Sequence, residues 1–198
     1  MKRPATLWIL FGSAILWFLG LMLLWMQVAA WTSYPAAGIT QIVLENGARD
    51  WVRTVRKFPG LLEVNTRIKV DIPGRGRGEL VAEVDPARYA YGFPLFLALL
   101  LASRSSRILR RALAGYVFLL IPQAFSLTFD ILKQVMVAAD STASLGVAQW
   151  QLEAIALGYQ YGALLLPTLA PVALWLWLDR EFLATVIVDG WLRKTAGD

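Results

Sequence analysis

Polar side chains that could do chemistry occur inside two long apolar stretches of the chain. Between residues 112 and 137 they recur at spacings of three, four and seven, which places them on one stripe of a helix. Between residues 152 and 178, Glu153 and Gln160 are seven residues apart and point roughly the same way. Polar groups at membrane depth are costly and commonly face a bundle interior or a partner. The pattern predicts intramembrane interaction sites at Gln123, Asp130, Lys133, Gln134, Glu153 and Gln160.

The same residues give little support for catalysis. Asp130 and Lys133 are three apart and can pair, whereas Ser126 lies two turns from Lys133, about 10 Å along a helix and too far for direct proton transfer. Asp130 and Glu153 form no paired-aspartate motif, which leaves a carboxylate hydrolase weakly supported. The chain has no Cys and no His, which excludes thiol nucleophiles, imidazole bases and Cys or His metal sites. We therefore predict no catalytic residue, no cofactor and no metal.

A row of small residues accompanies the last apolar stretch. Ala154, Gly158 and Gly162 repeat at every fourth position, so they lie in one line on a helix. Small residues in such a row let a second helix approach closely. Pro167 and Pro171 follow in the same stretch, and a simple lipid-facing anchor needs neither. Together these residues predict a helix that packs against other helices inside a membrane.

Composition places the chain among membrane proteins. Of its 198 residues, 58% are hydrophobic and 9 are Trp, and the mean hydropathy is +0.55. The net charge is +5, but Lys and Arg gather in short segments beside apolar runs, as membrane orientation signals do. We therefore expect membrane lipid around the chain and no nucleic-acid partner.

The patterns along the chain predict an α-helical membrane protein with about four transmembrane helices. The predicted spans cover residues 7–31, 89–103, 112–137 and 152–178. A small extracytoplasmic insertion, residues 32–88, separates the first two spans and combines a helix with a β-hairpin. Residues 179–198 are expected to form a cytoplasmic tail.

Two patterns follow one another within the insertion. Apolar residues at helical intervals over 36–58 predict a basic amphipathic helix, broken at Gly47, that lies on the membrane surface or packs on a small domain. Alternation over 62–72 and again over 79–85 predicts two strands joined by a Gly-rich turn at 73–78. A lone hairpin is marginal in water, so it must pack on the helix, the membrane surface or a partner.

Charge beside the first span sets the expected orientation. Lys2 and Arg3 precede this span, whereas the segment that follows it has no Lys or Arg until Arg49. Residues 138–151 also have none. Basic residues close to a span favour the cytoplasmic side, and longer segments translocate largely regardless of charge. We therefore expect both termini in the cytoplasm and the insertion outside, although the insertion carries as many Lys and Arg as the cytoplasmic segments together.

Three segments carry a resemblance to a known family. They read YAYGFPLFLALLLA over 89–102, IPQAFSLTFDILKQV over 121–135 and EAIALGYQYGALLLPTLAPVALWL over 153–176. Together they resemble the exosortase H-associated membrane protein family. The resemblance implies a bacterial inner-membrane protein that accompanies an exosortase. Exosortases are polytopic membrane transpeptidases that cut a C-terminal sorting tail, and their catalytic residues are a Cys, an Arg and a His.

Two functions follow, and they predict different partners. This chain lacks the Cys and His of an exosortase, so the resemblance implies a non-catalytic accessory protein that binds an exosortase, another integral membrane protein or the sorting-tail substrate. The alternative is a small transport or channel-like subunit with the polar residues of the last two spans along a path. Discontinuous, proline-bearing spans are typical of transporters, but four spans without an internal repeat argue against a self-sufficient one.

Overall fold

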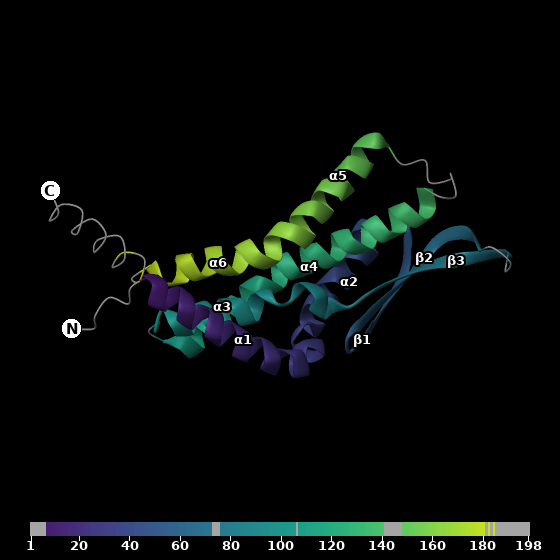
Figure 1. The fold of residues 1–198 in the computed structure, drawn as a ribbon. Helices are drawn as coiled ribbons and strands as arrows, with labels where there is room; N and C mark the ends of the chain where they lie inside the picture. Colours follow the sequence, from purple (N-terminus) through teal and green to yellow (C-terminus); the bar gives the residue numbers. More distant parts are fainter. Residues whose placement is uncertain are drawn as a thin grey trace.

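Helices run along the length of the molecule, and a small antiparallel sheet lies at one end (Figure 1). The computed structural model describes residues 7–72, 76–105, 107–140, 148–180, 182 and 184. The elements in chain order are α1 (Leu7–Thr32), α2 (Tyr34–Gly47), β1 (Val52–Phe58), β2 (Leu61–Ile72), β3 (Gly76–Val84), η1 (Pro86–Tyr89), α3 (Gly92–Ala102), α4 (Ile108–Asp140), α5 (Gln149–Gln160), η2 (Tyr161–Leu165) and α6 (Leu166–Leu178). Of the two η elements, η1 is a 3-10 turn and η2 is a turn of π-helix between α5 and α6.

Three of the described helices are long and apolar enough to cross a membrane. They cover Ile9–Thr32, Ile108–Ala139 and Gln149–Leu178, in agreement with a helical membrane protein. The second of the four predicted spans, residues 89–103, is not confirmed, because the apolar helix there, Pro86–Ala102, is shorter than the described helices that could cross a membrane. Its regular part, α3, has 11 residues and rises about 16 Å, against a hydrocarbon core of roughly 30 Å.

Other helices enclose α3 within the bundle. Phe96, Ala98 and Leu100 are 0% exposed, and Phe96 and Leu100 pack in one core with Leu10 of α1. Gly115 of α4 permits this close packing, because a Cβ at that position would lie 2.0 Å from the Phe96 ring. The short helix is therefore stabilised by its neighbours along most of its surface.

The sheet has the strand order β1-β2-β3, and each neighbouring pair is antiparallel. β2 and β3 are the two strands predicted from the alternating pattern. The turn predicted at 73–78 is shorter in the structure, because residues 76–78 already belong to β3, and residues 73–75 lie outside the described part. One face of the sheet is buried through Leu62, Val64 and Ala82.

The structure corrects one prediction in the insertion: residues 52–58, predicted as helix, form strand β1. The buried residues Val52 and Val55 are three apart, a spacing that imitates a helix. A bulge-like register shift between Val52 and Thr54 causes this spacing, because it displaces the strand from strict alternation. The preceding helix, α2, ends at Gly47, where the break was predicted. The predicted hairpin is therefore part of a three-stranded sheet.

Side chains of α2 cover the outer edge of β1. Gln41 Nε2 donates to Val55 O at 3.2 Å, and Val55 N donates to Glu45 Oε1, also at 3.2 Å. An uncovered edge strand presents unpaired N–H and C=O groups to other chains. The two contacts satisfy these groups at the centre of β1 and fix α2 against the sheet.

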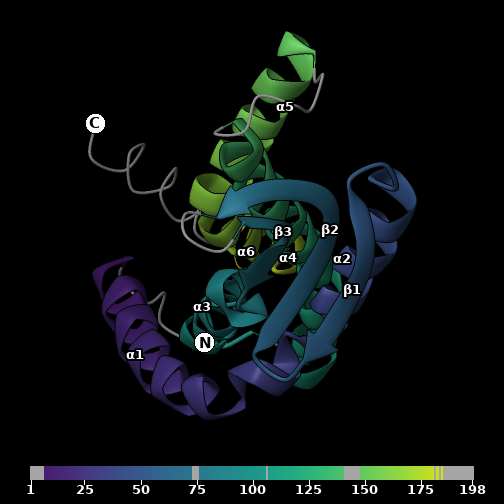
Figure 2. The same cartoon turned by 90° about the vertical axis from the view of Figure 1, so that its right-hand side faces the viewer.

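Two hydrophobic cores meet along α4. The core at the sheet end combines side chains from α2, the strands and the C-terminal half of α4, among them Leu44, Val64, Leu127, Ile131 and Val135. The core at the other end combines α1, α3, α6 and the N-terminal half of α4, among them Leu10, Phe96, Leu100, Leu119 and Trp175. Figure 2, the view from the sheet end, shows the strands and α2 to one side of α4. α4 has 33 residues and a length of about 50 Å, so it extends beyond a hydrocarbon core of roughly 30 Å.

Candidate interaction sites

A buried carboxylate on α4 forms the centre of the first polar cluster. Asp130 is 3% exposed, and its Oδ2 lies 3.4 Å from Nη1 of Arg88. The Tyr89 phenol interacts with the same carboxylate. Both partners belong to η1, whose first turn is fixed by a 2.8 Å hydrogen bond from Ala87 N to the Asp85 side chain. The ion pair therefore joins the segment that follows the sheet to α4.

Lys133 has a different partner from the one that its spacing predicts. Its ammonium lies 3.9 Å from the centre of the Tyr159 ring on α5, while Asp130 pairs with Arg88. Such a cation–π contact contributes roughly 0.5–2 kcal/mol, depending on its exposure. Gln134, the next residue along α4, is partly buried. Asp130 and Lys133 thus connect α4 to two elements, η1 and α5, instead of pairing with each other.

Two further polar residues of the α4 stripe bind backbone carbonyls of other elements. Gln123 is 8% exposed and donates from Nε2 to Pro86 O at 3.1 Å. Ser126 is 0% exposed, and its Oγ lies 2.6 Å from Gly162 O and 2.8 Å from Pro122 O of its own helix, with the shorter contact to Gly162. These bonds satisfy buried polar groups that would otherwise destabilise the bundle.

Pro167 explains the hydrogen bond between Ser126 and the carbonyl of Gly162. In the π-helical turn, Leu166 N donates to Tyr161 O. The corresponding donor for Gly162 O would be residue 167, but Pro167 has no N–H. The hydroxyl of Ser126 supplies the missing donor. A proline in one helix therefore explains why a serine is buried in its neighbour.

The two polar residues predicted on α5 lie away from this cluster. Glu153 is exposed and accepts a 3.2 Å hydrogen bond from Gln149 Nε2, on the same helix. Gln160 is exposed as well. Neither makes a contact with Asp130 among the interactions of the described residues.

The row of small residues faces α4 at two of its three positions. Gly158 is buried, and a Cβ there would lie 2.2 Å from the Phe129 ring. Gly162 is buried too, and a Cβ there would lie 3.0 Å from the Ser126 Cα. Ala154, one turn earlier on α5, is exposed. The close approach of the helices is therefore confined to the end of α5 and to η2.

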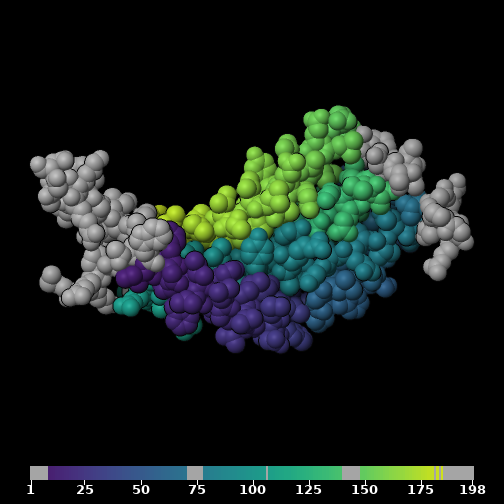
Figure 3. Space-filling view, in the orientation of Figure 1, coloured from purple at the N-terminus to yellow at the C-terminus, as the bar shows by residue number. Residues whose placement is uncertain are grey.

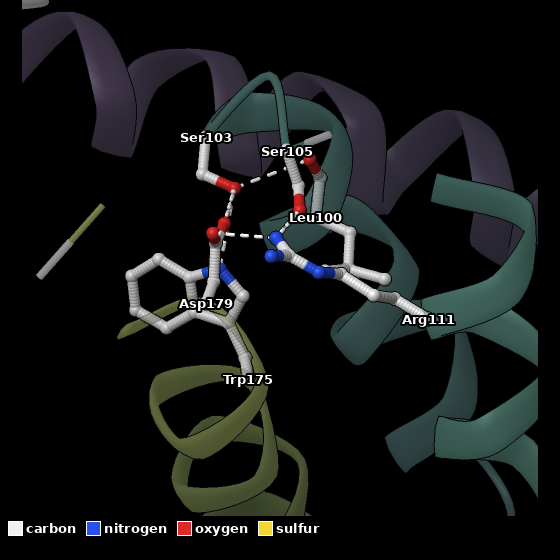
Figure 4. A network of polar contacts seen from close by, with 6 residues as sticks. All are labelled: Leu100, Ser103, Ser105, Arg111, Trp175 and Asp179. Atoms are coloured by element: carbon white, nitrogen blue, oxygen red, sulfur yellow. Dashed lines mark hydrogen bonds and ion pairs between the residues drawn. The ribbon is translucent and has the colours of Figure 1, made fainter. Parts of the chain in front are cut away.

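A second polar network lies at the end of the bundle opposite the sheet (Figure 4). We name it the inner network and define it as Ser103, Ser105, Arg111, Trp175 and Asp179. Nη1 of Arg111 lies 2.6 Å from Oδ1 of Asp179 and also donates to the Ser105 hydroxyl. Ser103 Oγ donates to the other Asp179 oxygen at 2.8 Å and accepts from Trp175 Nε1 at 3.3 Å. The network joins the α3–α4 connection, α4 and the end of α6.

The inner network was not among the predicted sites. Asp179 was assigned to the start of the tail, yet it is 3% exposed. The sequence did contain a signal for this pair: Asp179 directly follows an apolar helix, and the connection between α3 and α4 is rich in arginine. Its carboxylate is already bound by a guanidinium and a hydroxyl, so the network has the form of a structural ion pair and not of a nucleophile with a free base.

A small cavity lies between α1, α3, α4 and α6. Its volume is about 20 Å³, and Tyr116, Gln123 and Pro167 are among the side chains that line it. Trp25 also lines it, and the buried indole N–H of this residue has no hydrogen-bond partner. A cavity of this size accommodates about one water molecule.

The fold and these contacts define a helical membrane protein whose polar side chains join its helices and attach a small sheet to them. The particular family follows from comparison with known proteins. Residues 4–182 match the exosortase H-associated membrane protein family, and the chain belongs to it. This confirms the resemblance seen in the sequence. No curated protein and no solved structure matches the chain.

A methyl group added at residue 158 should push α5 away from α4. Gly158→Ala places a Cβ 2.2 Å from the Phe129 ring, and we expect overpacking of about 1–3 kcal/mol, seen as a lower melting temperature in detergent. The matched control is Gly20→Ala on α1, where nothing lies within 4 Å of the added atom. Equal melting temperatures for the two variants would contradict the proposed packing contact.

Removal of the inner carboxylate should destabilise the bundle strongly. Asp179→Ala leaves the partly buried Arg111 without its counter-charge, at an expected cost of about 3–5 kcal/mol. Thermal unfolding of the purified protein measures this loss. The double variant Arg111→Met/Asp179→Leu should recover most of it, because an apolar pair leaves no buried charge behind.

A second ion pair provides the control. Arg53 and Glu79 are 2.9 Å apart on the sheet, with side chains 59% and 47% exposed. Glu79→Ala should change stability by no more than about 1 kcal/mol, since exposed pairs contribute little. If Asp179→Ala and Glu79→Ala lowered the melting temperature equally, the inner network would not have the structural role assigned to it.

Proposed function

We propose that this chain is a non-catalytic accessory protein that binds the exosortase within the bacterial inner membrane. Membership of the exosortase H-associated family supports the association. The sequence has no Cys and no His, so it cannot contribute a thiol nucleophile or an imidazole base to tail cleavage. What it offers a partner is a surface, and one exposed apolar part of that surface is on α5.

The observation that carries the proposal is the exposed apolar face of α5. Among the described residues of this helix only Ile155 and Gly158 are buried. Trp150 and Leu157 are seven residues apart, so they lie on one side of the helix, and they are 68% and 53% exposed. Figures 1 and 3 show α5 projecting away from α4 and the body of the molecule. An exposed apolar surface of this kind marks a contact with lipid or with another protein.

The length of the helix Gln149–Leu178 indicates that a protein, and not lipid, contacts the exposed apolar face of α5. The continuous helix Gln149–Leu178 has 30 residues, or about 45 Å, whereas a bilayer core accommodates about 20 residues. Counting from the end at Leu178, the surplus falls on α5. The apolar side chains of α5 would therefore extend beyond the hydrocarbon, where a protein partner covers them and acyl chains do not. The exosortase is the partner that the family association favours, and the sorting-tail substrate is the other outcome for a test.

The transport alternative receives less support from the geometry. It requires the polar residues of α4 and α5 to line one path. Asp130 is paired with Arg88, Lys133 lies over an aromatic ring, and Glu153 is exposed on α5. These side chains serve separate contacts between elements, as packing residues do.

The proposal includes an orientation with both termini in the cytoplasm and the sheet outside. It is supported by exposed arginines that gather at the end of the bundle opposite the sheet, on the α3–α4 connection and after α6. Arginines next to spans favour the cytoplasmic side.

Single cysteines should report this orientation, because the chain has no Cys of its own. Thr54→Cys on β1 and Arg110→Cys at the start of α4 both replace exposed residues. In spheroplasts, a membrane-impermeant maleimide should label Thr54→Cys at once and Arg110→Cys only after permeabilisation. The reverse pattern would place the sheet in the cytoplasm and overturn the orientation.

Deletion of the gene should leave sorting tails unprocessed, and the α5 face should be needed to restore processing. When expressed in the deletion strain, the Trp150→Ala/Leu157→Ala variant should co-purify with less exosortase than the wild-type protein does. More of the tail-bearing protein should also remain uncleaved. Central apolar side chains in an interface commonly contribute more than about 1 kcal/mol each, so binding should weaken roughly tenfold or more. Immunoblotting of the tail-bearing protein and of the exosortase measures both effects.

The matched control changes two exposed apolar residues on α1, away from α5. Leu16 and Leu23 are 72% and 70% exposed, and Leu16→Ala/Leu23→Ala should complement the deletion fully. Normal tail processing after deletion would refute the accessory function itself. A deletion defect that Trp150→Ala/Leu157→Ala repairs completely would refute only the role of α5.

A further inference from the structure

Four exposed arginines surround the end of the bundle opposite the sheet. We name this group the basic rim and define it as Arg104, Arg107, Arg110 and Arg180. The first two lie in the connection between α3 and α4, the third in the first turn of α4, and the last directly after α6. The inner network holds these three segments together, so the rim is one surface although its members are far apart in sequence.

The backbone of the connection directs serines inward and arginines outward. Arg104 and Arg107 have φ values of +50° and +56°, the left-handed region that non-glycine residues rarely adopt. Between them Ser105 is 8% exposed and bound by Arg111, whereas Arg104 and Arg107 are exposed. Such a conformation persists where the surrounding contacts hold it. The inner network is the contact that holds this one.

The positive charge of the rim is not neutralised by the carboxylate beside it. Asp179 is the carboxylate that the described residues place at this end, and it is buried and paired with Arg111. Arg180 lies 5.9 Å from the centre of the Trp177 ring, a contact that leaves its charge in place. The four guanidinium groups therefore present uncompensated positive charge on the described surface, and they suit an anionic partner.

The depth of the rim matches the headgroup layer of a membrane. Leu113, which follows Arg110 by three residues on α4, is 67% exposed, and Leu109, which directly precedes Arg110, is 86% exposed. Trp177 is 50% exposed near the end of α6, and Trp is enriched where hydrocarbon meets water. The arginines thus lie where a lipid phosphate lies above its acyl chains, and a guanidinium can bind phosphate through two parallel hydrogen bonds.

We propose that the basic rim is a binding site for anionic phospholipids, with the phosphate at the arginines and the acyl chains along Leu109 and Leu113. This inference does not depend on the exosortase: it concerns the opposite end of the molecule from α5. Each basic residue near an anionic membrane surface adds about 1 kcal/mol of attraction. Bound anionic lipid holds the charged end of the bundle at the membrane surface.

The full chain, purified in a neutral detergent, should bind phosphatidylglycerol more tightly than the zwitterionic phosphatidylcholine. Native mass spectrometry counts the lipids retained during a titration. In Arg104→Gln/Arg107→Gln/Arg110→Gln the affinity for phosphatidylglycerol should fall roughly fivefold per arginine. The control Arg49→Gln/Arg56→Gln/Arg67→Gln removes three exposed positive charges at the sheet end and should leave the affinity unchanged.

Several results would overturn the proposal. Equal retention of the two lipids, or equal losses in the two triple variants, would show that the rim attracts anions only through the net charge. Displacement of phosphatidylglycerol by excess inorganic phosphate would identify a free phosphate site, because the leucines would then add nothing. If the rim variant does not fold, Arg110→Gln/Arg180→Gln keeps the connection between α3 and α4 intact and applies the same test.

Discussion

The length of α4 is the constraint on which the rest of the structure depends. A helix of 33 residues is about 50 Å long and cannot lie wholly within a hydrocarbon core of roughly 30 Å. The N-terminal and C-terminal halves of α4 therefore pack against different elements. α3 and α6 pack against its N-terminal half, with α1 packed on α3, and α2 and the sheet pack against its C-terminal half. The sheet has no separate core of its own, because Leu127 and Ile131 of the same helix complete it.

Prolines explain much of how α4 is joined to the last helix. Pro167 removes one backbone donor from that helix, and the turn before it widens into a π-helix. The carbonyl of Gly162 then accepts from Ser126 on α4, and the glycine brings the two backbones close. Beyond this contact α5 diverges. The π-helical turn, the close approach at Gly162 and the Ser126 hydroxyl thus join α4 to the last helix at one place.

Patterns within one segment were readable from the sequence, and contacts between segments were not. The apolar runs predicted the long helices, and alternation predicted β2 and β3. β1 was predicted as helix because its bulge spaces Val52 and Val55 as a helix would. The spacing of Asp130 and Lys133 suggested one pair, but Arg88 and Tyr159, from distant segments, are their partners. The inner network was missed for the same reason, since Arg111 and Asp179 are 68 positions apart.

The buried polar groups of the described chain are almost all satisfied by contacts within it. Trp25 Nε1 is the exception among the buried side-chain atoms described. A bundle that satisfies its own polar groups does not need a partner to complete its interior, so a partner must recognise its surface. Two described surfaces have the chemistry for recognition: the apolar face of α5 near the sheet end, and the basic rim at the other end. Because they lie at opposite ends of the long helices, a protein bound to one and lipid bound to the other would not compete. Lipid bound to the basic rim at one membrane surface would hold α5 at a fixed height above the opposite membrane surface.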